Sequence, residues 1–154
     1  EPVRRQLDHM KVNIDRDIGP MIESVKARSR TILHVAEQVA VRLDPTRATR
    51  DAKGEALVRK MGPAFAGNLT LATEALKSLK PAEWKPDQLL ATLKGVAEAH
   101  SLKLGDVMQP VRVALTGSTV SEPVNELLVV VGPQKSTDTL TSVARHLGGG
   151  IRSA

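Results

Sequence analysis

Apolar residues recur along much of this chain at steps of three and four, which is the spacing of one face of an α-helix. The first such stripe predicts either one long helix or two helices in series. It consists of Ile18, Met21, Ile22, Val25, Ile32, Val35, Ala36 and Val39. The turn-forming run DPTRATRD then interrupts the pattern from residue 44 to residue 51, so we expect a joint between two subdomains there.

Further stripes predict more helices after the joint. One stripe ends before Pro81, and the next follows Pro86 and Asp87, which are residue types typical of helix starts. The first contains Ala64, Phe65, Leu69, Ala72, Leu76 and Leu79, and the second contains Leu89, Leu90, Leu93, Val96 and Ala97. We expect the two aromatic residues, Phe65 and Trp84, to lie in the core.

The run KLGDVMQPVRVALTG, residues 103–117, predicts a helix with recognisable ends. Asp106 and Gln109 have the spacing of a capping box, in which each side chain bonds a free backbone N–H at the helix start. Gly117 suits the end, because glycine readily adopts the left-handed backbone conformation. Pro110 lacks an N–H donor, so we expect the helix to begin late or to bend there.

Two more helices are expected toward the C-terminus, with Ser121 and Ser136 as their N-caps. Their apolar residues are Val124, Leu127, Leu128 and Val131 in one, and Leu140, Val143, Ala144 and Leu147 in the other. A strand at the three valines 129–131 is the alternative. Because no alternating strand pair, glycine-rich phosphate loop or internal repeat is present, the pattern predicts an all-α helical bundle.

The charge of the chain favours an anionic partner. There are 22 Lys and Arg residues against 17 Asp and Glu residues, which gives a net charge of +5, and most of the excess lies in the first part of the chain. A basic surface attracts polyanions such as nucleic acids. A net charge of this size also serves solubility alone.

No set of side chains predicts catalysis or metal binding. The chain has no cysteine, and its four histidines are scattered at positions 9, 34, 100 and 146. No apolar run approaches the ~20 residues of a membrane span, and the N-terminus lacks the apolar stretch of a signal peptide. We therefore expect a soluble, cytoplasmic chain with no catalytic residue, no metal and no cofactor of its own.

The run from 103 to 117 resembles a signature near the C-terminus of bacterial-type glutamyl-tRNA synthetases. In that family a Lys-Leu-Gly, a Gln-Pro-x-Arg and an Ala-Leu-Thr-Gly occur in this order and spacing, and here they are residues 103–105, 109–112 and 114–117. Trp84 and the segment ESVKARSRTILHVAE, residues 23–37, match further parts of the family. The resemblance extends from about Ile18 to Leu147.

The resemblance implies an anticodon-binding region made of two packed all-α subdomains, residues 1–50 and 51–154. In the family, the catalytic domain that binds glutamate, ATP and Mg²⁺ is a separate part of the polypeptide, so this chain alone is expected to catalyse nothing. The implied partners are the tRNA for glutamate and the catalytic domain of the same polypeptide. Neither DNA nor a membrane is an expected partner.

Arg28 matches the arginine that faces the third anticodon base in family members that reject glutamine tRNA. Arginine carries only hydrogen-bond donors, cytosine presents the O2 and N3 acceptors, and guanine presents N–H donors at that edge. Glutamate anticodons end in C and glutamine anticodons end in G. An arginine at this position therefore favours the tRNA for glutamate.

The resemblance also places Arg112 at the first two anticodon bases, with Ser121, Glu122 and Val124 beside it. Four further residues, Lys26, Arg30, Lys103 and Gln109, are expected to make supporting or phosphate contacts, which position RNA without specifying its sequence.

The chain departs from the family pattern at three places. Glu122 stands where the family commonly has proline, Asn125 stands where it has phenylalanine, and the run VAVRL, residues 39–43, replaces an aromatic pair. Two alternative functions therefore stay open. One is a duplicate synthetase module with relaxed or glutamine-shifted specificity, and the other is a helical protein-interaction domain whose basic face binds an acidic partner.

Overall fold

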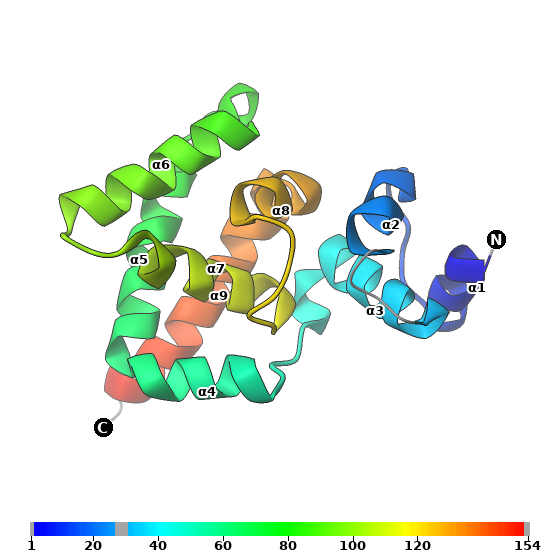
Figure 1. Cartoon of the computed structure of the whole chain (residues 1–154), viewed down its shortest axis with the longest axis horizontal. Coiled ribbons are helices and arrows are strands. Elements are labelled where there is room, and N and C mark those ends of the chain that lie inside the picture. The colour runs from blue at the N-terminus through cyan, green and yellow to red at the C-terminus, as the bar shows by residue number, and fades with distance from the viewer. Residues whose placement is uncertain (1, 27–30, 153–154) are drawn as a thin grey trace.

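The structure is a computed structural model that describes residues 2–26 and 31–152, and in these ranges every regular element is helical (Figure 1). The α-helices are α1 (Pro2–His9), α2 (Gly19–Lys26), α3 (Ile32–Leu43), α4 (Ala52–Met61), α5 (Pro63–Lys77), α6 (Pro86–Ala99), α7 (Leu104–Thr116), α8 (Val124–Val131) and α9 (Pro133–Arg152). Two short 3-10 turns, η1 (Pro45–Arg47) and η2 (Pro81–Glu83), complete the set. The predicted all-α fold is confirmed.

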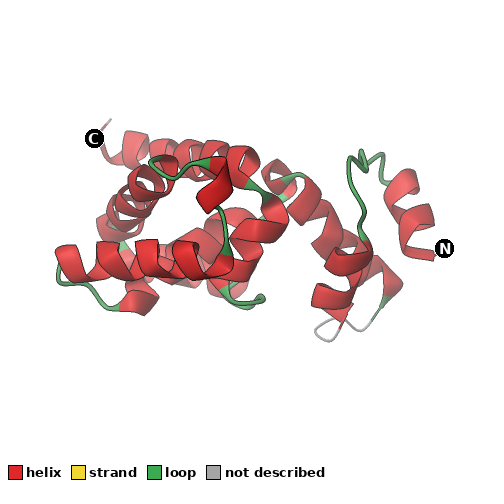
Figure 2. Cartoon of the chain, turned by 90° about the horizontal axis from the view of Figure 1, so that it is seen from above, coloured by secondary structure: helices red, strands yellow, loops and turns green. Residues whose placement is uncertain are grey.

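The helices surround two hydrophobic cores. The first core is formed by α1 to α3 and contains Leu7, Ile18 and Leu43, all of which are almost fully buried. The second and larger core is formed by α5 to α9 and includes Phe65 and Trp84, as expected from the sequence. Figures 1 and 2 show the α1–α3 group at one end of the molecule and the α4–α9 group at the other, with the chain passing between them after α3.

The first apolar stripe forms two helices in series, α2 and α3. Thr31 is the N-cap of α3, because its Oγ1 accepts a hydrogen bond from the His34 N–H at 3.0 Å. Most of the stripe is buried, but the Ile32 side chain is 51% exposed because it lies in the first turn of α3, beyond the packed face.

The start of α7 differs from the prediction. Lys103 is the N-cap and α7 begins at Leu104, so that Asp106 lies within the first turn and forms no capping box with Gln109. The helix continues through the buried Pro110.

The continuation of α7 past Pro110 has a visible cause. Pro110 has no N–H to offer the carbonyl four residues earlier, which belongs to Asp106. The side chain of Asn68 in α5 donates to this carbonyl in its place, with an Nδ2–O distance of 3.1 Å. A side chain from a neighbouring helix thus supplies the donor that the proline lacks. Gly117 ends α7 in the left-handed conformation, as predicted.

The last two helices also begin elsewhere than expected. The three valines 129–131 belong to α8, so the strand alternative is wrong. Pro123, not Ser121, precedes α8, and its carbonyl accepts the Glu126 and Leu127 N–H groups. Gly132, whose positive φ ends α8, is followed directly by Pro133 at the start of α9, so Ser136 is not a cap but a buried residue inside the helix.

Several polar contacts join the two groups of helices. Arg16 Nη1 donates to the Val130 carbonyl at the end of α8, at 2.7 Å. Lys135 Nζ lies 2.7 Å from both Asp15 Oδ2 and the Leu43 carbonyl. In the described part of the chain, no helix is both long enough and apolar enough to cross a membrane.

Candidate nucleic-acid interface

The region between the two groups of helices contains a small polar cavity. It has a volume of about 240 Å³ and lies where α2 and α3 face the segment that links α7 to α8. Its lining residues are Val25, His34, Gln38, Arg42, Asp51, Ser118, Val120 and Ser121. We call this region the junction cavity.

The structure brings Arg112 and Ser121 together, as the family resemblance implies. Arg112 lies near the C-terminal end of α7 and is half-buried. Its Nε donates to Ser121 Oγ at 2.8 Å, and the same hydroxyl donates to the Glu122 carbonyl at 2.6 Å. Both residues therefore have defined positions beside the junction cavity.

The Glu122 side chain is held inside the protein by an arginine from the other group of helices. Only 4% of the Glu122 side chain and 2% of the Arg42 side chain are exposed. Arg42 Nε donates to Glu122 Oε2 at 3.0 Å, and Arg42 Nη2 donates to Oε1, so the ion pair is bidentate.

Two neighbours complete this ion pair. The third nitrogen of the guanidinium, Arg42 Nη1, donates to the Gln38 carbonyl and to Gln38 Oε1 at 2.9 and 3.1 Å. On the α2 side, Ser24 Oγ donates to Glu122 Oε2 at 3.1 Å. The ion pair therefore joins α2, α3 and the segment before α8.

Burial and hydrogen bonding act in opposite directions on Glu122. Burial raises the pKa of its carboxyl, but the hydrogen bonds and charge of Arg42, a backbone N–H and the Ser24 hydroxyl lower it by more, and the net pKa is below the ordinary value of 4.5. Glu122 is therefore a carboxylate at neutral pH.

Glu122 and Val124, which the resemblance places beside Arg112, both have buried side chains. The Val124 side chain is 2% exposed and packs in the larger core, and the Glu122 carboxylate is enclosed by Arg42 and Ser24. Both side chains are buried in this structure, and their contacts with RNA stay predictions from the resemblance.

Arg28 and Arg30 lie outside the described residues. Among the described residues, Val25 in α2 and His34 in α3 line the junction cavity. Lys26 lies at the end of α2 and is exposed, and its Nζ is 4.0 Å from Glu23 Oε1.

Lys103 and Gln109 lie apart from this region. Lys103 is exposed at the opposite end of α7 from Arg112, and neither Lys103 nor Gln109 lines the junction cavity. The Gln109 Oε1 atom is buried, with no hydrogen-bond partner among the described residues. Their contact roles stay predictions from the resemblance.

Three residues of the interface, His34, Gln38 and Arg42, were not identified from the sequence. A signal for Arg42 was present, since Val35, Val39 and Arg42 follow one another at steps of four and three. The periodicity thus places an arginine on the buried face of α3, and a buried arginine requires an acidic partner. The departure at Glu122 supplies that partner.

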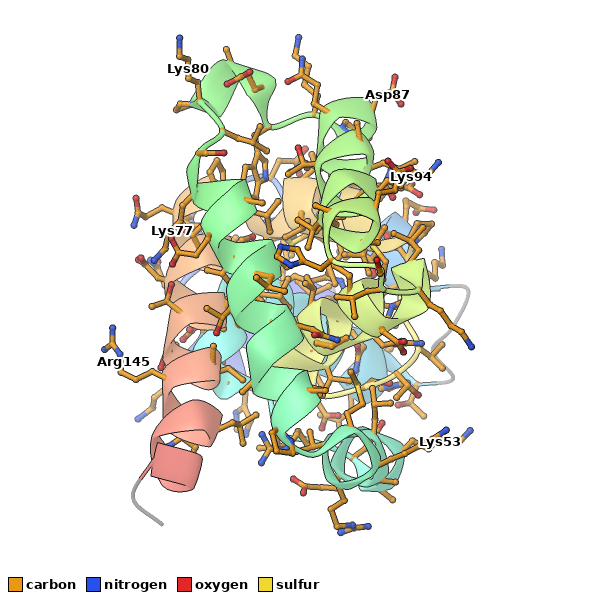
Figure 3. All side chains as sticks on the ribbon, turned by 90° about the vertical axis from the view of Figure 1, so that its left-hand side faces the viewer. Lys53, Lys77, Lys80, Asp87, Lys94 and Arg145 are labelled. Carbon is orange, nitrogen blue, oxygen red and sulfur yellow. The ribbon has the colours of Figure 1, made fainter. Side chains whose placement is uncertain are left out.

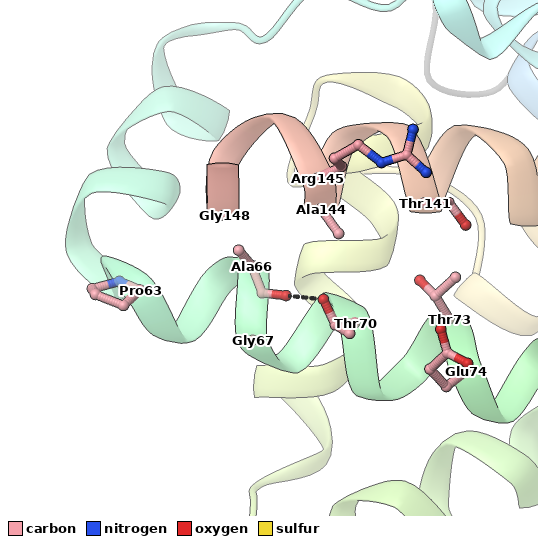
Figure 4. A pocket seen from close by; sticks show the side chains of 10 residues that line it. All are labelled: Pro63, Ala66, Gly67, Thr70, Thr73, Glu74, Thr141, Ala144, Arg145 and Gly148. Carbon is pink, nitrogen blue, oxygen red and sulfur yellow. Dashed lines mark hydrogen bonds between the residues drawn. The ribbon is translucent and has the colours of Figure 1, made fainter. Parts of the chain in front are cut away.

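A larger cavity, of about 510 Å³, lies between α5 and α9 (Figure 4). Small residues such as Ala66, Gly67 and Ala144 line it, and its threonine hydroxyls are used within their own helices. Thr70 Oγ1 donates to the Ala66 carbonyl at 2.8 Å, and Thr141 Oγ1 donates to the Thr137 carbonyl at 2.7 Å. Glu74 and Arg145 add one charge of each sign to the lining, and the cavity is separate from the junction cavity.

The cations of the larger group of helices are spread over its surface. Figure 3 shows Lys53, Lys77, Lys80, Lys94 and Arg145 pointing outward from α4, α5, the segment around η2, α6 and α9. Among the described residues, no cluster of His, Cys, Asp and Glu has the arrangement of a metal site. The interface around the junction cavity is therefore the candidate for binding a nucleic acid.

Comparison with known proteins shows which family the chain resembles. A family model described as "Anticodon binding domain" matches residues 3–143. Glutamate–tRNA ligase 2 of Rhodospirillum rubrum is 32% identical over 79% of this chain and 25% of its own length. Glutamate–tRNA ligase 1 of Sphingopyxis alaskensis is 32% identical over 96% of this chain and 29% of its own length. This chain thus spans between a quarter and a third of the length of these relatives.

A solved structure shows the same fold. The crystal structure of a glutamate tRNA ligase from Elizabethkingia meningosepticum matches with a TM-score of 0.75 over 94% of this chain and 28% of that chain, at 21% sequence identity. The family model matches nearly the whole sequence, and the chain therefore belongs to the anticodon binding domain family.

Proposed function

We propose that this chain recognises the anticodon of the tRNA for glutamate, as part of a glutamate–tRNA ligase whose catalytic domain belongs to the same polypeptide. The observation that carries the proposal is the contact of Arg112 with Ser121 beside the junction cavity, together with the position of Val25 and His34 on the same cavity. Residues from α2 and α3 and residues of the segment after α7 thus line one polar cavity, which supports the proposal.

Each of these residues has a different role in binding RNA, which follows from the chemistry of its side chain. Arg28 discriminates at the third anticodon base, because its donors match the acceptors of cytosine and face the N–H donors of guanine. Arg112 and Ser121 contact the first two bases. Lys26, Arg30 and Lys103 contact phosphates, which fix the position of the RNA.

The rest of the proposed reaction takes place outside this chain. ATP, Mg²⁺ and glutamate bind to the catalytic domain, and the enzyme acts in the cytoplasm. In this arrangement residues 1–50 and 51–154 are the two anticodon-binding subdomains, and the polar contacts between them keep both sets of residues directed at one anticodon.

The deciding experiment measures the affinity of this chain for the tRNA for glutamate and for the same tRNA with its third anticodon base changed from C to G. Tighter binding of the unchanged tRNA supports the proposal. Equal affinities contradict a discriminating role and favour relaxed specificity. No binding to either RNA favours a protein-interaction domain.

A further inference from the structure

The ion pair between Arg42 and Glu122 has a role beyond anchoring the fold. We infer that it is a positioning lock, which fixes α2 and α3 against the segment 118–123 and so sets how strictly the junction cavity discriminates between anticodon bases. This inference rests on the proposed function for its second part only. The first part, the locking of the two groups of helices, concerns the chain by itself.

The contacts of the ion pair connect three separate elements. Ser24 in α2 and Arg42 in α3 both bond the Glu122 carboxylate, although Arg42 and Glu122 are 80 residues apart in the sequence. The bidentate geometry fixes direction as well as distance, because both guanidinium N–H groups must align with both carboxylate oxygens. A shift of α2 and α3 along the segment would break this alignment.

The lock lies next to the residues proposed to contact RNA. Ser121 directly precedes Glu122 in the chain, donates to its carbonyl and accepts from Arg112. Arg42 itself lines the junction cavity. A movement of the Glu122 carboxylate is therefore transmitted to Ser121 through one peptide unit and to Arg112 through one hydrogen bond.

The other contacts between the two groups of helices do not replace the lock. Arg16 bonds the carbonyls of Val130 and Val131 at the far end of α8, and Lys135 bonds Asp15 and Leu43 at the start of α9. Glu122 precedes the near end of α8. On the cavity side, the side-chain hydrogen bonds of the Glu122 carboxylate join α2 and α3 to the segment before α8, in addition to the packing of α3 on α7 and α8.

Physical chemistry favours specificity over stability as the benefit of this pair. Removing two charges from water costs so much that replacing a buried ion pair by apolar residues is often neutral or stabilising. An apolar pair fills the space but has no directional preference. The double substitution Arg42→Met with Glu122→Leu therefore separates the two effects, since it removes the alignment and keeps the burial.

The first test measures the distance between α2 and α8 in the absence of RNA. Because the chain has no cysteine, spin labels are introduced at two exposed positions by Glu23→Cys in α2 and Glu126→Cys in α8. We expect a single narrow distance distribution in the otherwise unaltered chain and a broader or two-peaked one in the Arg42→Met, Glu122→Leu background. Equally narrow distributions would overturn the lock.

The second test measures selectivity. We expect the double variant to reduce the ratio of affinities for third-base C and G about fivefold or more, the size of one lost base-discriminating contact. Glu122→Gln, which keeps the shape of the side chain, is measured in parallel and should lower the ratio in the same direction. The matched control, Leu93→Ala, removes packing in α6, which does not line the junction cavity, and should leave the ratio unchanged.

The outcomes separate the inference from the proposed function. If the distance distribution between the labels broadens in the double variant but the ratio of affinities for third-base C and G is unchanged, the inferred role of the ion pair in selectivity is wrong. If the ratio falls equally in Leu93→Ala, general loss of stability explains it and the lock is overturned as a specificity device. If the unaltered chain binds no tRNA, the proposed function fails, and the labels alone decide whether the ion pair locks the helices.

Discussion

At the scale of single residues, the side chains that matter are those whose charge is buried or directed. Sequence reasoning found Arg112 and Ser121 through the family signature, and the structure places them in contact. The periodicity of α3 places Arg42 on the buried face, but its partner lies 80 residues away, so the ion pair could not be predicted. Glu122 was noticed as a departure from the family, but its function as a buried counter-ion depends on three-dimensional packing.

The Arg28 proposal predicts a loss of selectivity. Arg28→Ala should weaken binding of the third-base C tRNA by about 1–3 kcal/mol and leave the G form little changed, since only the first presents acceptors to arginine. The measurement is the affinity for each RNA. Lys26→Ala, two residues away and exposed, is the control and should weaken both RNAs alike. Equal losses for both RNAs in Arg28→Ala would contradict the proposal.

The lowered pKa of Glu122 predicts acid sensitivity. A group whose pKa is lower in the folded state stabilises that state above its unfolded pKa and loses this effect as the pH falls through its folded pKa. The free energy of unfolding should therefore decrease as the pH falls below the ordinary carboxyl pKa of 4.5. Chemical denaturation at a series of pH values measures this.

The control for the acid prediction is Glu122→Gln, which does not titrate at this position. Removing one charge of a buried ion pair should cost about 3–5 kcal/mol at neutral pH. The difference from the unaltered chain should then shrink as the pH falls. A difference that is constant with pH would show that another carboxyl, such as Asp15, whose pKa is lowered by Lys135, is responsible.

At the scale of elements, the apolar stripes predicted most of the helices, and errors were concentrated at their ends. Two helices were not predicted: α1, with only Val3 and Leu7 buried, and α4, which follows the joint. The starts of α7 and α9 were placed too late, because a capping side chain was expected where a neighbouring helix or a Gly-Pro step governs the backbone. Asn68, which bonds the Asp106 carbonyl, has no local sequence signal.

Gly117 gives a prediction at this scale. Its φ of +79° is the left-handed conformation, and a Cβ at this position would overlap the Thr49 carbonyl. Gly117→Ala should therefore lower the free energy of unfolding by about 1–3 kcal/mol or more. Gly95→Ala, in the middle of α6 with open space around the added carbon, should instead stabilise by up to about 1 kcal/mol. Thermal unfolding of both variants checks the opposite signs.

At the scale of the whole molecule, the net charge of +5 predicts a salt-dependent interaction with RNA. Each phosphate that a cation neutralises releases counterions, so the affinity should fall linearly on logarithmic axes as salt rises. Lys26→Gln should reduce the slope by about 1. Lys94→Gln, on the exposed surface of α6, is the matched control and should leave the slope unchanged. An affinity that does not change with salt concentration would show that the positive charges do not contact the RNA.

The buried Arg42–Glu122 pair also limits which parts of related proteins can be exchanged in a chimera. A chimera that joins residues 1–50 of this chain to the remainder of a relative with proline at the Glu122 position would enclose an arginine without a counter-ion. The reverse chimera would enclose a carboxylate without a counter-ion if the relative has no arginine at position 42. The two halves are therefore matched to each other at positions 42 and 122, and an exchange between proteins has to transfer both residues together.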